Sequence, residues 1–500
     1  MPTRLLNRLK PTRTISGVTP IAVMVKPDSC PFNCIYCPGG KATNTPKSYL
    51  PDSPVVLRAA PLGYDPYRQV EVRLRHYRYM GHPVSKVELI VMGGTFTALP
   101  VDYQEWFVGN AYKAVNDYPV FTGPSASPDL DRELERNEGA EVRVVALTIE
   151  TRPDFAKPKH IDELLKLGAT RVELGVQSVF DDVLARVKRG HDVKAVVEAT
   201  RNLKDAAYKV CYHLMPGLPG SDPDRDLEMV KAVFEDDSFK PDCVKIYPTL
   251  VIPGTELYNM WLRGEYRSYS EGVWRWLIAR IMSMVPRWVR VMRLGRDIPL
   301  HWVVDGPRMG NMREVALSTM RSMGLGCVEI RCREVGHRYV KLGEIPNPRR
   351  LRINRIDYEA SGGHEVFLEV IDDEDTLYAL LRLRIPSPSA HRPEVRLGRA
   401  ALIRELHVYG PELPVGSRAQ DLIWWQHRGL GRMLMAKAEH IALEEFNANR
   451  MFVISGVGVR EYYRNLGYRK YPGSFYMFKD LKRSILDEEW VSHDDYLILG

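Results

Sequence analysis

The stretch Cys30-Pro-Phe-Asn-Cys34-Ile-Tyr-Cys37, which follows the apolar run Ile21–Val25, decides the fold. Three thiolates at this spacing can hold one face of an iron–sulfur cluster, whereas a closed cysteine-ligated cluster takes four thiolates. One iron would therefore stay open to a substrate or a cofactor. The alternatives are a zinc knuckle and a set of buried thiols. Zinc prefers a fourth nearby ligand, and no further Cys or His occurs before His76, so the spacing favours a cluster.

The chain from Ile21 to about Pro253 alternates short apolar runs with amphipathic stretches. Continuous apolar strands separated by helices predict an α/β fold with a parallel sheet and helices outside it. Six such units predict a partial (β/α)6 barrel, in which functional groups gather at the carboxyl ends of the strands. The predicted strands are 21–25, 87–92, 142–149, 171–176, 210–215 and 243–248. The cysteines follow the first strand, where an active site is expected.

Glycines and polar residues lie at the ends of the next predicted strands. Gly93 and Gly94 end the second strand, and glycine lets the backbone approach a ligand closely. Glu150 ends the third strand, while Glu173 and Gln177 lie along and after the fourth. Groups at the carboxyl ends of neighbouring parallel strands face one crevice. These five residues are therefore candidate ligands for a cofactor beside the cluster.

The cysteine spacing resembles that of the radical S-adenosylmethionine (SAM) enzymes, in which the open iron is chelated by SAM. Tyr36 fits, because that family usually has an aromatic residue before its last cysteine. The resemblance implies that Cys30, Cys34 and Cys37 bind a 4Fe-4S cluster and that Gly93-Gly94 holds the SAM amino group. It also implies that the three polar residues of the strand ends contact the ribose and methionine of SAM.

From about Pro346 the pattern changes to candidate strands at 365–370, 379–384 and 401–408, followed by a long helix at 431–447. Gln426-His-Arg-Gly429-Leu-Gly431 stands at the entrance of that helix, where backbone N–H groups can grip a pyrophosphate. A glycine helix start without a ligand is the alternative. The order of Glu405–Val408, this loop and Tyr462-Tyr463 resembles the acetyl-CoA-binding GNAT acetyltransferases, which have an α+β fold.

A cysteine-bearing linker separates the two halves. Cys327, Glu329, Cys332 and His337 are residue types that bind zinc. The alternative is a linker hairpin without metal. We favour a candidate zinc site made of these four residues.

A radical SAM barrel, such a linker and an acetyltransferase domain in one chain resemble the catalytic-subunit family of Elongator in its stand-alone archaeal or bacterial form. The specific pieces are Cys34-Ile-Tyr-Cys-Pro-Gly-Gly40, Lys86-Val-Glu-Leu-Ile-Val-Met-Gly-Gly-Thr-Phe96, Glu405-Leu-His-Val-Tyr-Gly410 and Ile454-Ser-Gly-Val-Gly-Val-Arg-Glu-Tyr-Tyr463. We expect a basic arm at 1–18, the radical SAM domain at 19–300, the linker at 301–345 and the GNAT-like domain at 346–500.

The resemblance implies an acetyl-CoA site to which both halves contribute. Lys86 would reach acetyl-CoA from the barrel side and, with Tyr462 and Tyr463, would be catalytic; Tyr463 would be the acid near the CoA sulfur. The other residues implied at this site are Glu405, Leu406, His407, Val408, Gln426, Gly429, Leu430, Gly431 and Arg432.

The implied activity is that of a tRNA wobble-uridine acetyltransferase, which uses SAM, a 4Fe-4S cluster and acetyl-CoA to add a carboxymethyl-type group at C5. The implied partners are the anticodon stem-loop of tRNA and a one-electron donor, and a homodimer is left open. One rival is a protein lysine acetyltransferase with a structural cluster. Another is a non-catalytic tRNA-binding protein that keeps both folds.

Composition sets outer bounds on these interpretations. The chain has 500 residues, a net charge of +7 and a pI of about 8.9, which suggests a polyanionic partner. Seven cysteines, odd in number, argue against a disulfide framework. The absence of a run of about 18 apolar residues and of an h-region near Met1 predicts a cytoplasmic protein without membrane spans.

Two basic stretches are candidates for RNA contact. Residues 1–20 carry Arg4, Arg8, Lys10 and Arg13, which form either a nucleic-acid arm or a solvated tail. Residues 254–320 interleave Arg with Trp. We expect most of the Trp side chains in the core and part of the Arg side chains on RNA.

Overall fold

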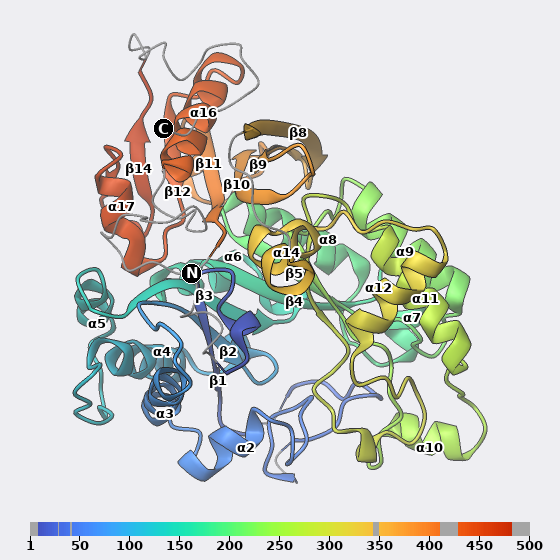
Figure 1. Ribbon diagram of the computed structural model, residues 1–500. Helices are drawn as coiled ribbons and strands as arrows, with labels where there is room; N and C mark the ends of the chain where they lie inside the picture. Colours follow the sequence, from blue (N-terminus) through green and yellow to red (C-terminus); the bar gives the residue numbers. More distant parts are fainter. Residues whose placement is uncertain (1–8, 29, 41–42, 344–349, 411–428, 483–500) are drawn as a thin grey trace.

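The computed structural model describes residues 9–28, 30–40, 43–343, 350–410 and 429–482 (Figure 1). The first of its two sheets is a parallel half-barrel whose strand order follows the chain. Its strands are β1 (Thr19–Met24), β2 (Lys86–Met92), β3 (Arg143–Thr151), β4 (Arg171–Gln177), β5 (Lys209–Leu214), β6 (Cys243–Ile246) and β7 (Arg290–Leu294). The predicted α/β class and parallel barrel are thereby confirmed.

The strand count differs from the prediction, because β7 adds a seventh strand inside the Arg- and Trp-rich segment. Arg290 and Arg293 interrupt the apolar run of β7, so the sequence pattern does not indicate a buried strand there. Both are paired in the fold: Arg290 lies 2.7 Å from Glu334, and Arg293 pairs with Asp297. Ion pairing allows a charged residue to lie in a partly buried strand. Such a strand is not recognised from the hydropathy of its residues alone.

Helices cover the outer face of this sheet, and acidic caps start several of them. The side chains of Asp65, Asp129, Asp192 and Asp222 each accept a hydrogen bond from a backbone N–H of the following helix. The helices are α2 (Val56–Ala59), α3 (Pro66–Tyr79), α4 (Val101–Asn116), α5 (Leu130–Asn137), α6 (Pro158–Lys166), α7 (Asp181–Arg186), α8 (Val193–Asp205), α9 (Pro223–Glu235), α10 (Glu256–Leu262), α11 (Glu271–Ser283) and α12 (Met312–Ser322).

The second sheet has the order β13-β14-β12-β11-β10-β9-β8 and is antiparallel except for the β11–β12 pair. Its strands are β8 (Arg352–Ala360), β9 (Gly363–Ile371), β10 (Leu377–Ile385), β11 (Ala400–Val408), β12 (Arg450–Val453), β13 (Arg469–Lys470) and β14 (Met477–Asp480). Its helices are α15 (Pro393–Arg396), α16 (Leu430–Glu444) and α17 (Arg460–Arg464), while α13 (Ile330–Arg333) and α14 (Val335–Leu342) form the linker.

The parallel pair β11–β12 opens along its length. Pairing joins Ala400–Ile403 to Arg450–Val453 and then stops, although β11 continues to Val408. On that side, within the described residues, no strand pairs with the backbone of 404–408. This part of β11 therefore presents peptide groups to a ligand.

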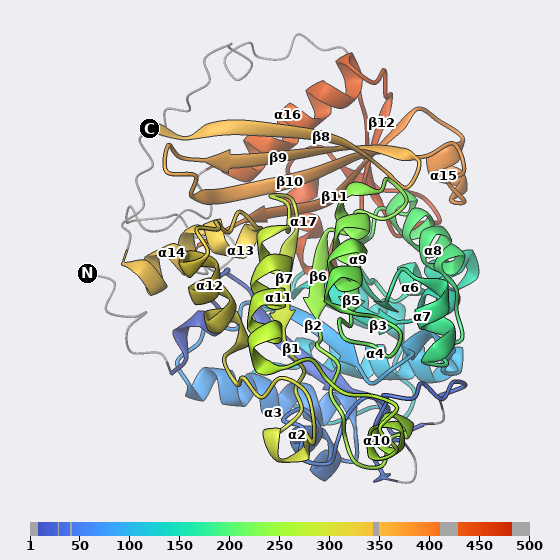
Figure 2. The same cartoon turned by 90° about the vertical axis from the view of Figure 1, so that its right-hand side faces the viewer.

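The two sheets form one packed body, in which the second sheet stacks on one end of the barrel (Figure 2). Fully buried ion pairs join them: Arg404 donates to both carboxylate oxygens of Asp242 at 2.7 Å, and Arg384 pairs with Asp205 at 2.7 Å. Gly456 lies so close to β3 that a Cβ there would stand 2.0 Å from the carbonyl oxygen of Val145.

The basic segment at the N-terminus is not a free arm from Thr12 onward. Thr14 and Ile15 are buried, and Ile15 packs against Gly336 of α14. Arg4 and Arg8 lie outside the described residues. Among the described residues, no helix has the length and apolar character needed to cross a membrane.

The arginines of 254–296 are mostly engaged within the protein. Arg263, Arg275 and Arg287 each form an ion pair with an acidic side chain, and Trp274 is fully buried. The expectation that most Trp side chains lie in the core is met in full by Trp274 alone among the five of residues 254–320: Trp261, Trp288 and Trp302 are half-buried, and Trp276 is 37% exposed. The paired arginines have less charge to offer to RNA.

Candidate active site: two cavities at opposite ends of the barrel

The first cavity, which we call the carboxyl-end cavity, lies where the parallel strands end. Cys30, Cys34 and Cys37 line it together with Gly94, Glu150 and Gln177. All three cysteines are half-buried free thiols. The fold thus brings the predicted cluster ligands and three of the five predicted SAM ligands to one place.

Arginines surround the middle cysteine. Arg189 donates to the Cys34 sulfur at 3.5 Å, and the Arg152 guanidinium lies 3.6 Å from the centre of the Phe32 ring. Burial raises the pKa of the Cys34 thiol, but the charges of Arg189 and Arg152 outweigh it and the pKa falls below its ordinary value. A thiolate is therefore favoured at Cys34, and thiolates are the ligands of iron–sulfur clusters.

The carboxyl-end cavity also holds buried polar atoms without a hydrogen-bond partner among the described residues. They are Nη1 of Arg152, Oε1 of Gln177 and Nη1 of Arg296. An unsatisfied buried donor or acceptor costs about 1–3 kcal/mol, so such atoms commonly mark a ligand position. Three thiols facing the same space as these atoms fit a cluster with a polar, charged cofactor beside it.

Two of the predicted SAM ligands are placed elsewhere. Gly93 packs behind the cavity, where a Cβ would lie 2.5 Å from Cγ2 of Val25. Glu173 is fully buried and does not line the cavity. It pairs with Lys245 and with Arg171 at 3.3 Å, and accepts from His213 at 2.9 Å. Glu173 is thus held by cations and is not available to SAM in this structure.

The second cavity, which we call the interdomain cavity, has a volume of about 800 Å³ and lies between the amino ends of the barrel strands and the second sheet. Lys86 lines it from β2, and Tyr462 and Tyr463 line it from α17. The other predicted acetyl-CoA residues that line it are Glu405, Leu406, His407, Val408, Gly429, Leu430, Gly431 and Arg432. Gln426 lies outside the described residues.

The start of α16 faces this cavity, and the first N–H groups of a helix have no partner within the helix. Gly429 caps the helix at φ 86°, a left-handed conformation that favours glycine. A Cβ on Gly431 would lie 2.7 Å from the hydroxyl of Tyr462, so glycine lets that hydroxyl reach the helix start. The positive end of the helix dipole can bind a phosphate there.

The ionisable groups of the interdomain cavity have distinct protonation states. Burial raises the pKa of Tyr462 to about 12 and that of Tyr463 further, so both hydroxyls keep their protons at neutral pH and can donate one. Burial raises the pKa of Glu405, but Lys209 and Arg382 outweigh it and keep the carboxylate ionised. Glu405 is therefore an ion-pair partner rather than a free base. Burial lowers the pKa of His407, whose Nε2 lies 2.9 Å from the carbonyl oxygen of Ser16.

The structure adds cavity residues that sequence patterns did not indicate. The N-terminal segment forms one wall of the interdomain cavity, with Thr12, Arg13, Ser16, Gly17 and Val18. The linker contributes Arg331 and His337. No local signal could have shown this, because these contacts join segments hundreds of residues apart.

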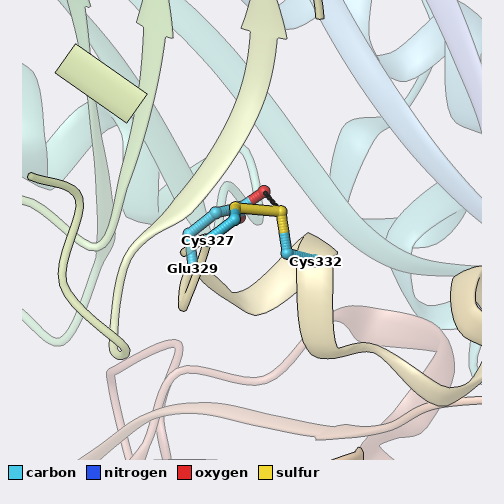
Figure 3. A group of neighbouring side chains, drawn as sticks. All are labelled: Cys327, Glu329 and Cys332. Atoms are coloured by element: carbon cyan, nitrogen blue, oxygen red, sulfur yellow. Dashed lines mark hydrogen bonds between the residues drawn. A yellow bond between two sulfur atoms is a disulfide. The ribbon is translucent and has the colours of Figure 1, made fainter. Parts of the chain in front are cut away.

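The four predicted zinc ligands do not form one site here. Cys327 and Cys332 are joined by a disulfide, and Glu329 lies beside them (Figure 3). Glu329 is already engaged, since it accepts from Arg313 at 2.8 Å and from the Val291 N–H at 3.1 Å. His337 instead faces the interdomain cavity. The disulfide form offers no thiolates, so a zinc site with both cysteines remains a prediction for the reduced chain only.

Comparison with known proteins shows to which family this chain belongs. Residues 24–233 match the radical SAM superfamily, and residues 241–322 match the radical SAM C-terminal domain. The tRNA uridine(34) acetyltransferase of Methanocaldococcus jannaschii is 48% identical over 93% of this chain and 85% of its own length. Elongator complex protein 3 of Homo sapiens is 43% identical over 95% of this chain and 86% of its own. The chain belongs to the Elongator complex protein 3 family. This confirms the resemblance drawn from the sequence motifs.

A solved structure supports the same conclusion for the fold. The archaeal Elp3 of Methanocaldococcus infernus, with an N-terminal deletion, superposes with a TM-score of 0.81 at 44% identity, covering 94% of this chain and all of that one. The bacterial tRNA uridine(34) acetyltransferase of Dehalococcoides mccartyi is 48% identical and is covered over 99% of its length. The relatives therefore share both halves of the molecule.

Proposed function

We propose that this protein is a tRNA wobble-uridine acetyltransferase that attaches a carboxymethyl-type group to C5, using SAM in the carboxyl-end cavity and acetyl-CoA in the interdomain cavity. One observation carries the proposal: residues of the barrel and of the second sheet line one cavity, with Lys86 opposite β11 and the start of α16. The names of the relatives as tRNA uridine(34) acetyltransferases support the choice of substrate.

In the carboxyl-end cavity Cys30, Cys34 and Cys37 would hold the cluster, and Glu150 and Gln177 would orient SAM. The bound cluster would supply one electron to SAM, which yields methionine and a 5′-deoxyadenosyl radical. The cavity walls would keep water and other hydrogen donors away from that radical. The wobble base would enter this cavity from a single-stranded anticodon loop, because a base outside a duplex is cheaply unstacked.

In the interdomain cavity the N–H groups at the start of α16 would bind the pyrophosphate, and the open backbone of 405–408 would hold the pantetheine arm. A hydrogen atom would leave the acetyl methyl group, and the resulting carbon radical would add to C5 of the uridine. Loss of the C5 proton and one electron restores the uracil ring and balances the electron that SAM cleavage consumed. Thioester hydrolysis then leaves the carboxymethyl group, with Tyr462 or Tyr463 donating a proton to the CoA sulfur.

The test is anaerobic incubation of the reconstituted protein with tRNA, SAM, dithionite and carbon-labelled acetyl-CoA. Label in the nucleoside at the wobble position supports the proposal. Label confined to protein lysines would support a protein lysine acetyltransferase instead. No label in either tRNA or protein would support a non-catalytic tRNA-binding protein.

A further inference from the structure

Side chains that point into the barrel line the two cavities from opposite ends. On β2 the half-buried positions Lys86, Glu88, Ile90 and Met92 alternate with buried ones, as expected for one face of a strand. The first three line the interdomain cavity, while Met92 lines the carboxyl-end cavity. Ile90 and Met92 are two residues apart, which is about 7 Å along a strand. The two cavities therefore approach each other closely inside the barrel.

On β4 and β5 one residue of the inward face lies between the two cavities. On β4, Arg171 lines the interdomain cavity and Gly175 the carboxyl-end cavity, so only Glu173 stands between them on that face. On β5, Lys209 and His213 line the two cavities in the same order, with Cys211 between them. A partition one side chain thick thus separates the cavities.

The partition is buried and continues across β4, β5 and β6. Glu173 is in register with Cys211, and Cys211 with Cys243 on β6. All three are 0% exposed, and Lys245 is 8% exposed. None of the four lines either cavity. We call Glu173, Cys211, Cys243 and Lys245 the lumen partition.

The ion pairs of the lumen partition allow it to open without leaving a buried cation alone. Glu173 pairs with both Lys245 and Arg171. Each cation has a second carboxylate on its own side: Arg171 lies 2.5 Å from Glu88, and Lys245 lies 3.4 Å from Glu150. An unpaired buried charge is the large cost in separating such groups, and these second partners remove that cost for the two cations. Glu173 itself would keep its hydrogen bond with His213.

We propose that the two cavities are the ends of one channel through the barrel, and that the lumen partition opens to admit the acyl end of an acyl-CoA thioester to the SAM side. This inference rests on the proposed function. The two cavities open at opposite ends of strands that span roughly 20 Å. A channel through the barrel would let the acyl group in one cavity reach SAM in the other. The hydrogen atom would move from the thioester methyl to C5′ of the deoxyadenosyl radical, so that one C–H bond breaks and one forms.

A binding experiment tests the channel without turnover. SAM affinity is measured by calorimetry on anaerobically reconstituted protein, with acetyl-CoA or octanoyl-CoA already bound. An octanoyl chain that passes the partition would occupy SAM space, so SAM binding should weaken about tenfold or more relative to acetyl-CoA. In Cys211→Leu, which thickens the partition, the difference between the two acyl-CoAs should vanish. Cys211→Ala, the matched control, should keep it.

The second readout is deuterium in 5′-deoxyadenosine formed from trideuterated acetyl-CoA. The wild type and Cys211→Ala should transfer deuterium, and Cys211→Leu should transfer at least tenfold less while binding both ligands normally. Cys243→Leu, on the next strand, repeats the test if Cys211→Leu fails to fold.

Equal SAM affinity with both acyl-CoAs in the wild type, or undiminished transfer in a folded Leu variant, would overturn the channel. A wild type that transfers no deuterium would overturn the proposed function, and the calorimetric comparison would still decide the channel.

Discussion

Neighbouring charges and burial shift the pKa of individual cysteine thiols in the carboxyl-end cavity. Cys34 lies beside Arg189 and Arg152, whose charges overcome the effect of burial and lower the pKa of its thiol. Cys37 shows the opposite direction, because burial raises its pKa. Cys34 and Cys37 therefore have different electrostatic environments within one cavity.

Replacing Cys34 by Ser should abolish the brown chromophore after anaerobic reconstitution, because a serine oxygen is a poor ligand for this type of cluster. SAM cleavage should be lost with it, whereas acetyl-CoA affinity should stay the same, since its cavity lies at the other end of the barrel. Absorption spectra and calorimetry measure both properties. Cys332→Ser is the control and should keep the chromophore; a brown Cys34→Ser protein would remove this cysteine from the cluster.

A buried carboxyl away from both cavities gives a pH prediction. Asp226 is 2% exposed and accepts from the Gly217 N–H, the Ser221 hydroxyl and the Tyr269 hydroxyl. Burial raises its pKa from 3.8 to about 6. Between these values the folded state binds more protons than the unfolded state, so stability falls as pH rises through this window. The rise of the pKa from 3.8 to about 6 corresponds to roughly 3 kcal/mol of folding stability, which is lost across this window.

Urea unfolding of the wild type and of Asp226→Asn between about pH 4 and pH 6 tests this assignment. The free energy of unfolding should decline with pH less steeply in Asp226→Asn, which has no proton to lose there. Parallel pH profiles of the two proteins would contradict the raised pKa.

At the scale of elements, the proposed function assigns acetyl-CoA binding to the loop-to-helix entry of α16. Gly429→Glu and Gly429→Gln share the strain of a side chain at φ 86°, and beyond its chain neighbours no atom of the described residues lies within 4 Å of a Cβ there, so they differ mainly in charge. A carboxylate at a helix start competes with a bound phosphate for the helix dipole, which is worth about 0.3–2 kcal/mol. Acetyl-CoA affinity should therefore be about 2- to 30-fold weaker in the Glu variant than in the Gln variant. Equal affinities in calorimetry would mean that this entry does not hold the pyrophosphate.

Elements also show where sequence reasoning succeeds. Apolar runs predicted six barrel strands, because buried parallel strands must be apolar on both faces. The run Arg290-Val-Met-Arg-Leu294 is not indicated by the sequence as a strand, because its two arginines break the apolar pattern. In the fold Arg290 pairs with the distant Glu334, and Arg293 pairs with Asp297 four residues further on. The contact of Glu173 with SAM stays a prediction: its position on β4 follows from the sequence, whereas its pairing with Lys245 and Arg171 does not.

At the scale of the whole molecule, the two halves depend on each other through buried charge. Asp242 is fully buried at the amino end of β6 and pairs with Arg404 of β11. Arg404 also pairs with Glu365 at 2.7 Å, so the carboxylates of both halves share one guanidinium. This contact is one of several that hold together the two halves lining the interdomain cavity.

Asp242→Asn should lower stability by about 1–3 kcal/mol, because Arg404 loses two charge-assisted hydrogen bonds but keeps its second partner, Glu365. Asp131→Asn on the exposed surface of α5 is the control and should change stability by about 0.5 kcal/mol or less. Thermal unfolding should also broaden or split in Asp242→Asn as the halves lose their coupling. A stability equal to that of the wild type would show that this pair does not join the halves.

The central claim is that both cavities of one chain act together on one tRNA, and a complementation assay tests it most directly. Wild type, Cys34→Ser, Gly429→Glu and an equal mixture of the two variants are incubated with tRNA, SAM, dithionite and acetyl-CoA labelled at both acetyl carbons. Mass spectrometry of the wobble nucleoside then measures incorporation of both labelled carbons. With acetyl-CoA held well below its wild-type Kd, we predict full labelling from the wild type, none from Cys34→Ser, reduced labelling from Gly429→Glu, and no more from the mixture than from its Gly429→Glu component alone. Labelling by the mixture clearly above that component would contradict the account, because the two cavities would then not need to lie in the same chain.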